Sequence, residues 1–181
     1  MKKQTNFITI LFFLSIGLFA QENLSQTSSN TKLTIENRKH EIKLGVIKAL
    51  AGPILDFEYE QILNKYSSFG GNTVIKLNQG TYVYDFLLSP FYRIYFTETK
   101  EYGTNGFFAQ AFLSYYNGKN NIIWDNKKFN SFGIGFGIGK KWVNKKGFVF
   151  QFLLGCARTI SSTESAPKAI FQGDISVGYR F

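Results

Sequence analysis

From residue 40 to residue 181 the chain repeats one pattern, in which apolar side chains take every second position of short segments separated by turn-like residues. The last segment shows this pattern best. Its apolar positions are Phe171, Ile175, Val177, Tyr179 and Phe181, and its intervening positions are Gln172, Asp174, Ser176, Gly178 and Arg180. Successive side chains of a β-strand point to opposite faces, so a period of two predicts strands with one apolar and one polar face.

Eight such segments follow one another, at residues 40–50, 54–63, 67–77, 86–96, 106–116, 131–143, 147–158 and 169–181. Phe, Tyr and Trp make up 18% of the chain, and its 17 glycines far outnumber its 3 prolines, which favours strands and turns. We therefore predict an all-β fold, namely an eight-stranded antiparallel up-and-down transmembrane β-barrel. Proline cannot donate a ladder hydrogen bond, so we expect a bulge at Pro90 in the fourth segment.

Residues 1–20 have the parts of a cleavable signal peptide. Lys2 and Lys3 supply positive charge, residues 7–19 carry no charge, and Ala20 offers a small residue at the cut. We expect residues 1–20 to be this leader, residues 21–39 a flexible periplasmic segment and residues 40–181 the barrel. Export argues against a nucleic-acid partner although the net charge is +9, and the single Cys156 excludes an internal disulfide.

The connectors between the segments differ in length. Those after the second and sixth segments are short, whereas those after the third, fifth and seventh (78–85, 117–130 and 159–168) are longer and polar. Outer-membrane barrels have short periplasmic turns and longer external loops, so this pattern favours such a barrel with both termini on the periplasmic side. Ile122, Ile123 and Trp124 interrupt one polar loop, and we interpret them as a tip that contacts a surface ligand or lipid.

Alternation alone does not decide whether the apolar face lines a ligand cavity, as in a soluble lipocalin-like barrel, or meets lipid. The polar face favours the membrane interpretation because it combines many glycines with a few charges of both signs, as a crowded lumen requires. We expect a polar network that closes the lumen, formed by Lys43, Asp56, Glu58, Glu60, Arg93, Asp174 and Arg180. Interfacial aromatic girdles are expected at Tyr115, Tyr116 and Trp124 on one side and at Trp142, Phe148, Tyr179 and Phe181 on the other.

The chain ends on Tyr179-Arg180-Phe181, after a strand that carries Asp174 on its polar face. This ending resembles the C-terminal insertion signal of outer-membrane proteins, with Ser176 where glycine is usual. Residues 40–181 as a whole resemble small eight-stranded barrels of the OmpA/OmpX type. The resemblance implies a place in outer-membrane lipid, reached through the barrel-assembly machinery, with Tyr179 and Phe181 as the insertion signal.

No residue pattern predicts catalysis, a cofactor or a metal site. His40 is the only histidine and starts the first strand, at the opposite end from where lipid-modifying enzymes of the outer membrane pair histidine with serine. Asp56, Glu58 and Glu60 share one face and could act as acid and base or bind a cation, but ion pairing in the lumen explains them better. We expect a non-catalytic structural or surface-interaction protein. A soluble apolar-ligand barrel and a lipid-modifying enzyme are the alternatives.

Overall fold

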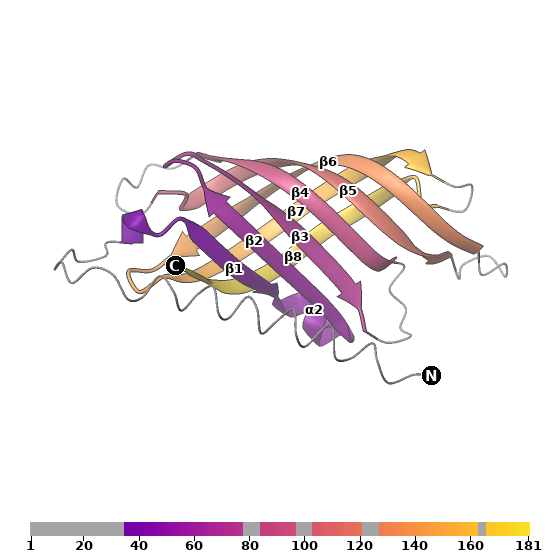
Figure 1. Cartoon of the computed structure of the whole chain (residues 1–181), viewed down its shortest axis with the longest axis horizontal. Coiled ribbons are helices and arrows are strands. Elements are labelled where there is room, and N and C mark those ends of the chain that lie inside the picture. Colours follow the sequence, from indigo (N-terminus) through magenta and orange to yellow (C-terminus); the bar gives the residue numbers. More distant parts are fainter. Residues whose placement is uncertain (1–34, 78–83, 97–102, 121–126, 163–165) are drawn as a thin grey trace, which may run out of the picture. The chain divides into compact units, whose positions relative to one another are not determined.

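A computed structural model describes residues 35–77, 84–96, 103–120, 127–162 and 166–181. The chain divides into two units, Met1–Lys32 and Leu33–Phe181, and all the described residues belong to the second. Eight antiparallel strands close into one barrel in chain order, so that β8 pairs with β1 (Figure 1). They are β1 (His40–Gly45), β2 (Ile54–Ile62), β3 (Ser67–Lys76), β4 (Tyr84–Phe96), β5 (Gly106–Asn120), β6 (Lys127–Val143), β7 (Phe148–Ser162) and β8 (Ala169–Arg180).

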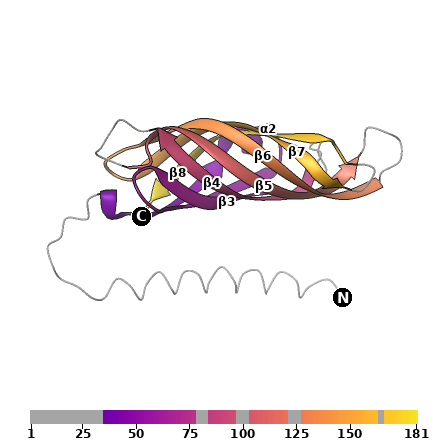
Figure 2. The ribbon, with the colours of Figure 1, turned by 90° about the horizontal axis from the view of Figure 1, so that it is seen from above.

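This topology confirms the predicted eight-stranded up-and-down barrel. Because neighbouring strands run antiparallel, the 63–66 and 144–147 turns lie at the same end as the chain terminus Phe181. We name it the turn end, and the opposite one the loop end. The strands wrap around the barrel axis at an angle, as closure of a sheet requires (Figure 2).

The prediction of a bulge at Pro90 is wrong. Pro90 lies opposite Gly71 with its ring outward, and β4 keeps one register with β5 on either side of it. The register shifts instead between Tyr84 and Phe86, and again between Phe132 and Gly133. Both irregularities lie near the loop end, away from Pro90, so the missing N–H of the proline does not cause them.

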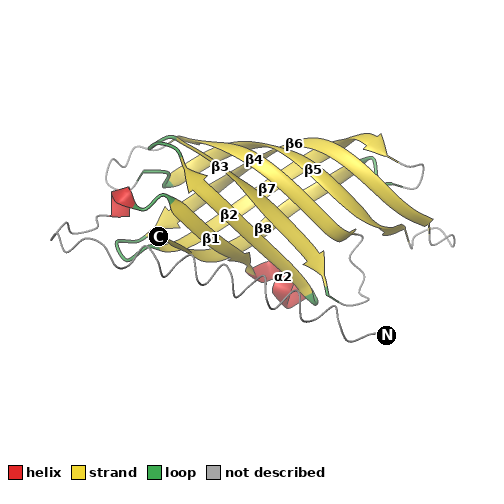
Figure 3. Ribbon diagram, in the orientation of Figure 1, coloured by secondary structure: helices red, strands yellow, loops and turns green. Residues whose placement is uncertain are grey.

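The first predicted segment, 40–50, is strand for only half of its length. β1 ends at Gly45, and residues 46–51 form the short helix α2 (Val46–Ala51), shown in red in Figure 3. Beyond Gly45 both β8 and β2 continue toward the loop end, and α2 packs against both of them. A helix therefore takes the place of a strand in this part of the wall. The other helix in the described part of the chain, η2 (Ile35–Asn37), precedes β1.

The apolar face of the sheet points out of the barrel. Phe136 and Ile138 on β6, for example, expose 70% and 68% of their surfaces, whereas the glycines that alternate with the apolar residues of this strand face inward. Tyr116 departs from the sequence expectation, because its side chain is completely buried inside the barrel and belongs to no outer girdle. Within the described residues, neither helix is long and apolar enough to cross a membrane.

Candidate functional site

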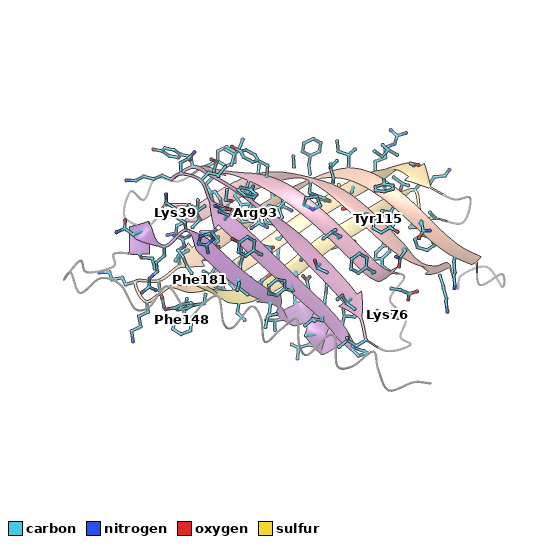
Figure 4. All side chains as sticks on the ribbon, viewed as in Figure 1. Lys39, Lys76, Arg93, Tyr115, Phe148 and Phe181 are labelled. Carbon is cyan, nitrogen blue, oxygen red and sulfur yellow. The ribbon has the colours of Figure 1, made fainter. Side chains whose placement is uncertain are left out.

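The interior near the turn end holds a cluster of buried charged side chains. Its members come from six of the eight strands, at inward positions near the ends of those strands. We name this set the charged cluster: Glu41, Lys43, Glu58, Glu60, Arg93, Tyr95, Lys141, Gln151 and Arg180. Figure 4 labels Arg93 among the side chains at this level.

Strand register explains why the charged cluster needs cations from the far wall. Glu41 on β1 lies directly opposite Glu60 on β2, and like charges in that position repel each other. Lys141 reaches across from β6 and donates to both carboxylates, with each nitrogen–oxygen distance 2.9 Å. Lys43 lies 3.2 Å from Glu41 and also donates to Glu60. Two ammonium groups thus hold together two carboxylates that would otherwise repel.

Glu60 is the residue with the most partners in the cluster. Besides the two lysines, its carboxylate accepts hydrogen bonds from Ser68 at 2.6 Å, Arg93 at 2.7 Å and Tyr95 at 2.5 Å. Its side chain is completely buried. Burying a carboxylate costs little only when its oxygens are fully hydrogen-bonded, and here both oxygens accept several donors.

Arg93 links the opposite walls of the barrel. Its guanidinium donates to both oxygens of Glu58, at 2.8 and 3.1 Å, in the bidentate geometry that favours arginine over lysine. It also donates to Gln110 at 2.7 Å and to Gln151 at 2.9 Å. The Phe91 ring lies 4.0 Å from the guanidinium carbon, so an aromatic face covers the cation as well.

Two charged members of the cluster, Glu41 and Lys141, and its uncharged members Tyr95 and Gln151 were missed by sequence reasoning, although the signal was present for the charged pair. Lys141 continues the inward row of alternate glycines that ends at Gly139, and Glu41 stands two residues before Lys43. A strict count of every second position would have found both. Arg180, which was expected, donates to Glu41 at 2.7 Å and closes the cluster at β8.

Asp56 and Asp174 were expected in the same network, but the structure places them in a separate group beside α2. Asp56 accepts hydrogen bonds from Lys48 of α2 and from Asn72. Asp174 accepts from the backbone N–H of Ile47 at 3.0 Å, and its other carboxylate oxygen lies 3.7 Å from the Lys48 nitrogen. The helix is therefore held against the barrel by Lys48, which lies between two buried aspartates.

Toward the loop end the interior changes from charged to apolar. We name this second set the aromatic cluster: Ile54, Val74, Tyr84, Leu87, Phe91, Phe112, Tyr116, Phe129, Ala157 and Ile170. Glycine makes room for it, since a Cβ added at Gly135 would overlap the Phe112 ring and lie 2.6 Å from the carbonyl oxygen of Cys156. Phe112 thus occupies space that a larger residue at Gly135 would take.

The remaining sequence-predicted residues lie elsewhere. His40 shares a 2.7 Å hydrogen bond with the Tyr59 hydroxyl and stacks on Phe181 at the turn end. Tyr179 and Phe181 point outward there, as Figure 4 shows for Phe181. Ile122, Ile123 and Trp124 lie outside the described residues. No group of three or more His, Cys, Asp or Glu side chains in the described part of the chain is arranged to hold a metal ion.

Fold and interior together define a small closed up-and-down barrel in which hydrogen bonds cross the interior from wall to wall. Among solved structures the chain is similar to the N-terminal β-barrel domain of OprF from Pseudomonas aeruginosa, with a TM-score of 0.57 and 14% identity over 80% of this chain and 98% of that one. At this identity the likeness shows the fold alone. No model of a known protein family and no curated protein matches the sequence.

Proposed function

We propose that this chain is an integral outer-membrane β-barrel with a non-catalytic role in the cell envelope. The observation that carries the proposal is the arrangement of the two faces of the sheet. Large apolar side chains on the described strands point outward, for example Phe132, Phe136, Ile138 and Phe171, whereas charged side chains fill the interior near the turn end. A water-soluble lipocalin-like barrel has the reverse arrangement, so lipid is the solvent that fits this surface.

Three further features support the same proposal. The barrel has the fold of the OprF barrel domain. Trp142, Phe148, Tyr179 and Phe181 gather on the outside near the turn end, where an interfacial belt would lie. Residues 1–20 fit a leader that carries the chain out of the cytoplasm, and the C-terminal aromatics fit recognition by the barrel-assembly machinery.

The same arrangement supports a closed lumen. Arg93 and Lys141 reach across to carboxylates on β1 and β2, and large rings fill the interior above them. Eight strands enclose a space just wide enough for side chains to fill, so we propose that the barrel conducts ions and small solutes poorly. Its function would then lie in envelope integrity or in surface contact through the segment that joins β5 to β6.

Membrane fractionation tests the central proposal. We expect the full chain, expressed in a bacterium with two membranes, to sediment with outer membranes and to need detergent for its release. Unboiled samples should migrate differently from boiled samples on a denaturing gel, because a folded barrel survives the detergent. Recovery in the soluble periplasmic fraction without detergent would overturn the proposal.

Planar-bilayer recordings test the closed lumen separately. The purified barrel should give no steady conductance steps, and a persistent open channel would contradict this part of the proposal while leaving the membrane location intact. For surface contact, replacement of Ile122, Ile123 and Trp124 by serine should weaken adhesion of cells that display the protein. Unchanged adhesion would overturn the proposal that these three residues contact a surface ligand.

A further inference from the structure

A pocket of about 260 Å³ opens at the turn end of the barrel, beside the start of β1. Among the residues that the structure describes, its lining includes four cations, Arg38, Lys39, Lys65 and Arg180, and no acidic residue. Arg180 lies at the base, where its charge is paired with Glu41. The other three cations are half-buried or exposed, and we name them the upper cations; Figure 4 shows Lys39 at this end of the barrel.

The three upper cations differ from every charge in the interior. Among the described residues, Arg38, Lys39 and Lys65 form no ion pair with a carboxylate. Arg38 uses one nitrogen, Nη1, for all its hydrogen bonds, to the Lys146 carbonyl oxygen at 3.1 Å, the Tyr179 hydroxyl at 3.0 Å and the Arg180 carbonyl oxygen at 3.3 Å. Its Nη2 and Nε donate to no group in the part of the chain that the structure describes. The guanidinium is thus held in place by Nη1, while the N–H groups of Nη2 and Nε stay available to a ligand.

The backbone around the pocket is fixed. The carbonyl oxygen of Lys39 accepts from Ile62 at 2.7 Å, and that of Lys65 accepts from Thr104 at 2.9 Å. Gly103 and Thr104 both have left-handed φ angles, 48° and 45°, which is rare for a β-branched residue such as threonine. Arg180 holds this segment through the Thr104 hydroxyl at 2.8 Å. Thr104, which follows the lining residue Gly103, is therefore held in this conformation at a conformational cost.

We propose that this pocket binds a phosphate group, held by Arg38, Lys39 and Lys65. Three cations that line one cavity and form no ion pair within the described part of the chain favour a compact anion with several acceptor oxygens. A phosphate could belong to an anionic lipid headgroup or to a soluble phosphate compound. The lipid source rests on the proposed membrane function, since the pocket would then lie at the level of the inner-leaflet headgroups, whereas the soluble source does not.

The test uses the full barrel in a neutral detergent, titrated with glycerol phosphate while the amide NMR signals of Gly103 and Thr104 are followed. These signals should shift saturably. The variant Lys39→Gln/Lys65→Gln should bind about tenfold more weakly, because it loses two charge-assisted donors. Its matched control is Lys119→Gln/Lys128→Gln, which removes the same charge from exposed positions at the loop end and should bind like the parent. Equal weakening in both variants would show nonspecific charge attraction and overturn the proposal.

A second arm identifies the source of the phosphate. Native mass spectrometry from mixed micelles should retain phosphatidylglycerol over phosphatidylcholine in the parent and lose that preference in Lys39→Gln/Lys65→Gln. Shifts with glycerol phosphate but no lipid preference would assign the pocket to a soluble ligand. If neither probe distinguishes the parent from the pocket variant, the pocket binds no phosphate. Neither result depends on where the protein fractionates, so a failure here is separate from a failure of the membrane proposal.

Discussion

The charged cluster and the aromatic cluster fill the same barrel in two different ways. Near the turn end, long side chains such as Arg93 and Lys141 cross the interior and are fixed by ion pairs. Toward the loop end, rings such as Phe112 fill it by bulk and are accommodated by glycine on the neighbouring strand. The first arrangement depends on charge balance and the second on volume. Substitutions that change only one of these quantities should therefore affect only one cluster.

Loss of Glu60 is expected to have the largest effect. The variant Glu60→Ala removes one of the three carboxylates of the charged cluster, which already holds four cations, and takes a partner from Lys43, Arg93 and Lys141. Breaking a buried ion pair from one side costs about 3–5 kcal/mol, and here three cations lose a partner at once. Urea unfolding in lipid vesicles, followed by tryptophan fluorescence, measures the loss.

The isosteric Glu60→Gln separates charge from volume at the same position. It should lose most of the same stability, because the amide keeps the volume but removes the charge. A double variant, Glu60→Met/Arg93→Met, should be less destabilised than the sum of its single variants, since the two groups interact directly. Additive losses would show that the cluster is not one network.

Removal of the lysine that seats α2 should come next. In Lys48→Met the buried Asp56 and Asp174 lose the cation that lies between them. We expect a loss of about 2–4 kcal/mol, below that of a fully buried pair because the Lys48 side chain is 14% exposed. Hydrogen exchange at the Ile47 amide should accelerate, because that amide is bonded to Asp174. The further change Asp56→Asn should restore part of the loss by removing one unpaired charge.

An added side chain at Gly135 tests the aromatic cluster by volume alone. Gly135→Val should cost about 1–3 kcal/mol, since its new atoms overlap the Phe112 ring without changing any charge. Gly71→Val on β3 is the matched control, because a Cβ at that position meets no atom within 4 Å. The same unfolding experiment compares the two. Equal losses would mean that strand propensity, and not crowding of the interior, sets the cost.

The sequence predicted which face of its strand each side chain lies on, but not which side chains from different strands are in contact. Alternation alone put Lys43, Glu58 and Arg93 on the polar face, and the structure buries all three together. The alternation carries no information on where along the barrel axis a side chain lies, because that position depends on the stagger of the strands. Asp56 and Glu58 share a face and are neighbours in it, yet they belong to different groups.

The helix α2 was not foreseen for a related reason. Residues 46–51 (VIKALA) contain apolar and charged side chains that fit either a strand or one helical turn, so periodicity over so short a stretch does not decide. Tertiary contacts decide instead. Lys48 reaches the two buried aspartates, and the helix fills the wall between β8 and β2.

The smallest expected effect is the difference in unfolding free energy between two tyrosine-to-phenylalanine variants, one in each cluster. Tyr95 and Tyr116 are both buried, and each hydroxyl donates one hydrogen bond. Tyr95 donates to the Glu60 carboxylate, whereas Tyr116 donates to the hydroxyl of Thr159, which itself donates to the Pro167 carbonyl oxygen. Bonds to charged groups contribute about 1.5–3 kcal/mol, and those between neutral groups about 0.5–1.5 kcal/mol. Tyr95→Phe should therefore lower the free energy of unfolding by roughly 1 kcal/mol more than Tyr116→Phe, with both rings kept. Since volume is almost unchanged in either variant, an equal loss in the two would mean that charge does not distinguish the clusters.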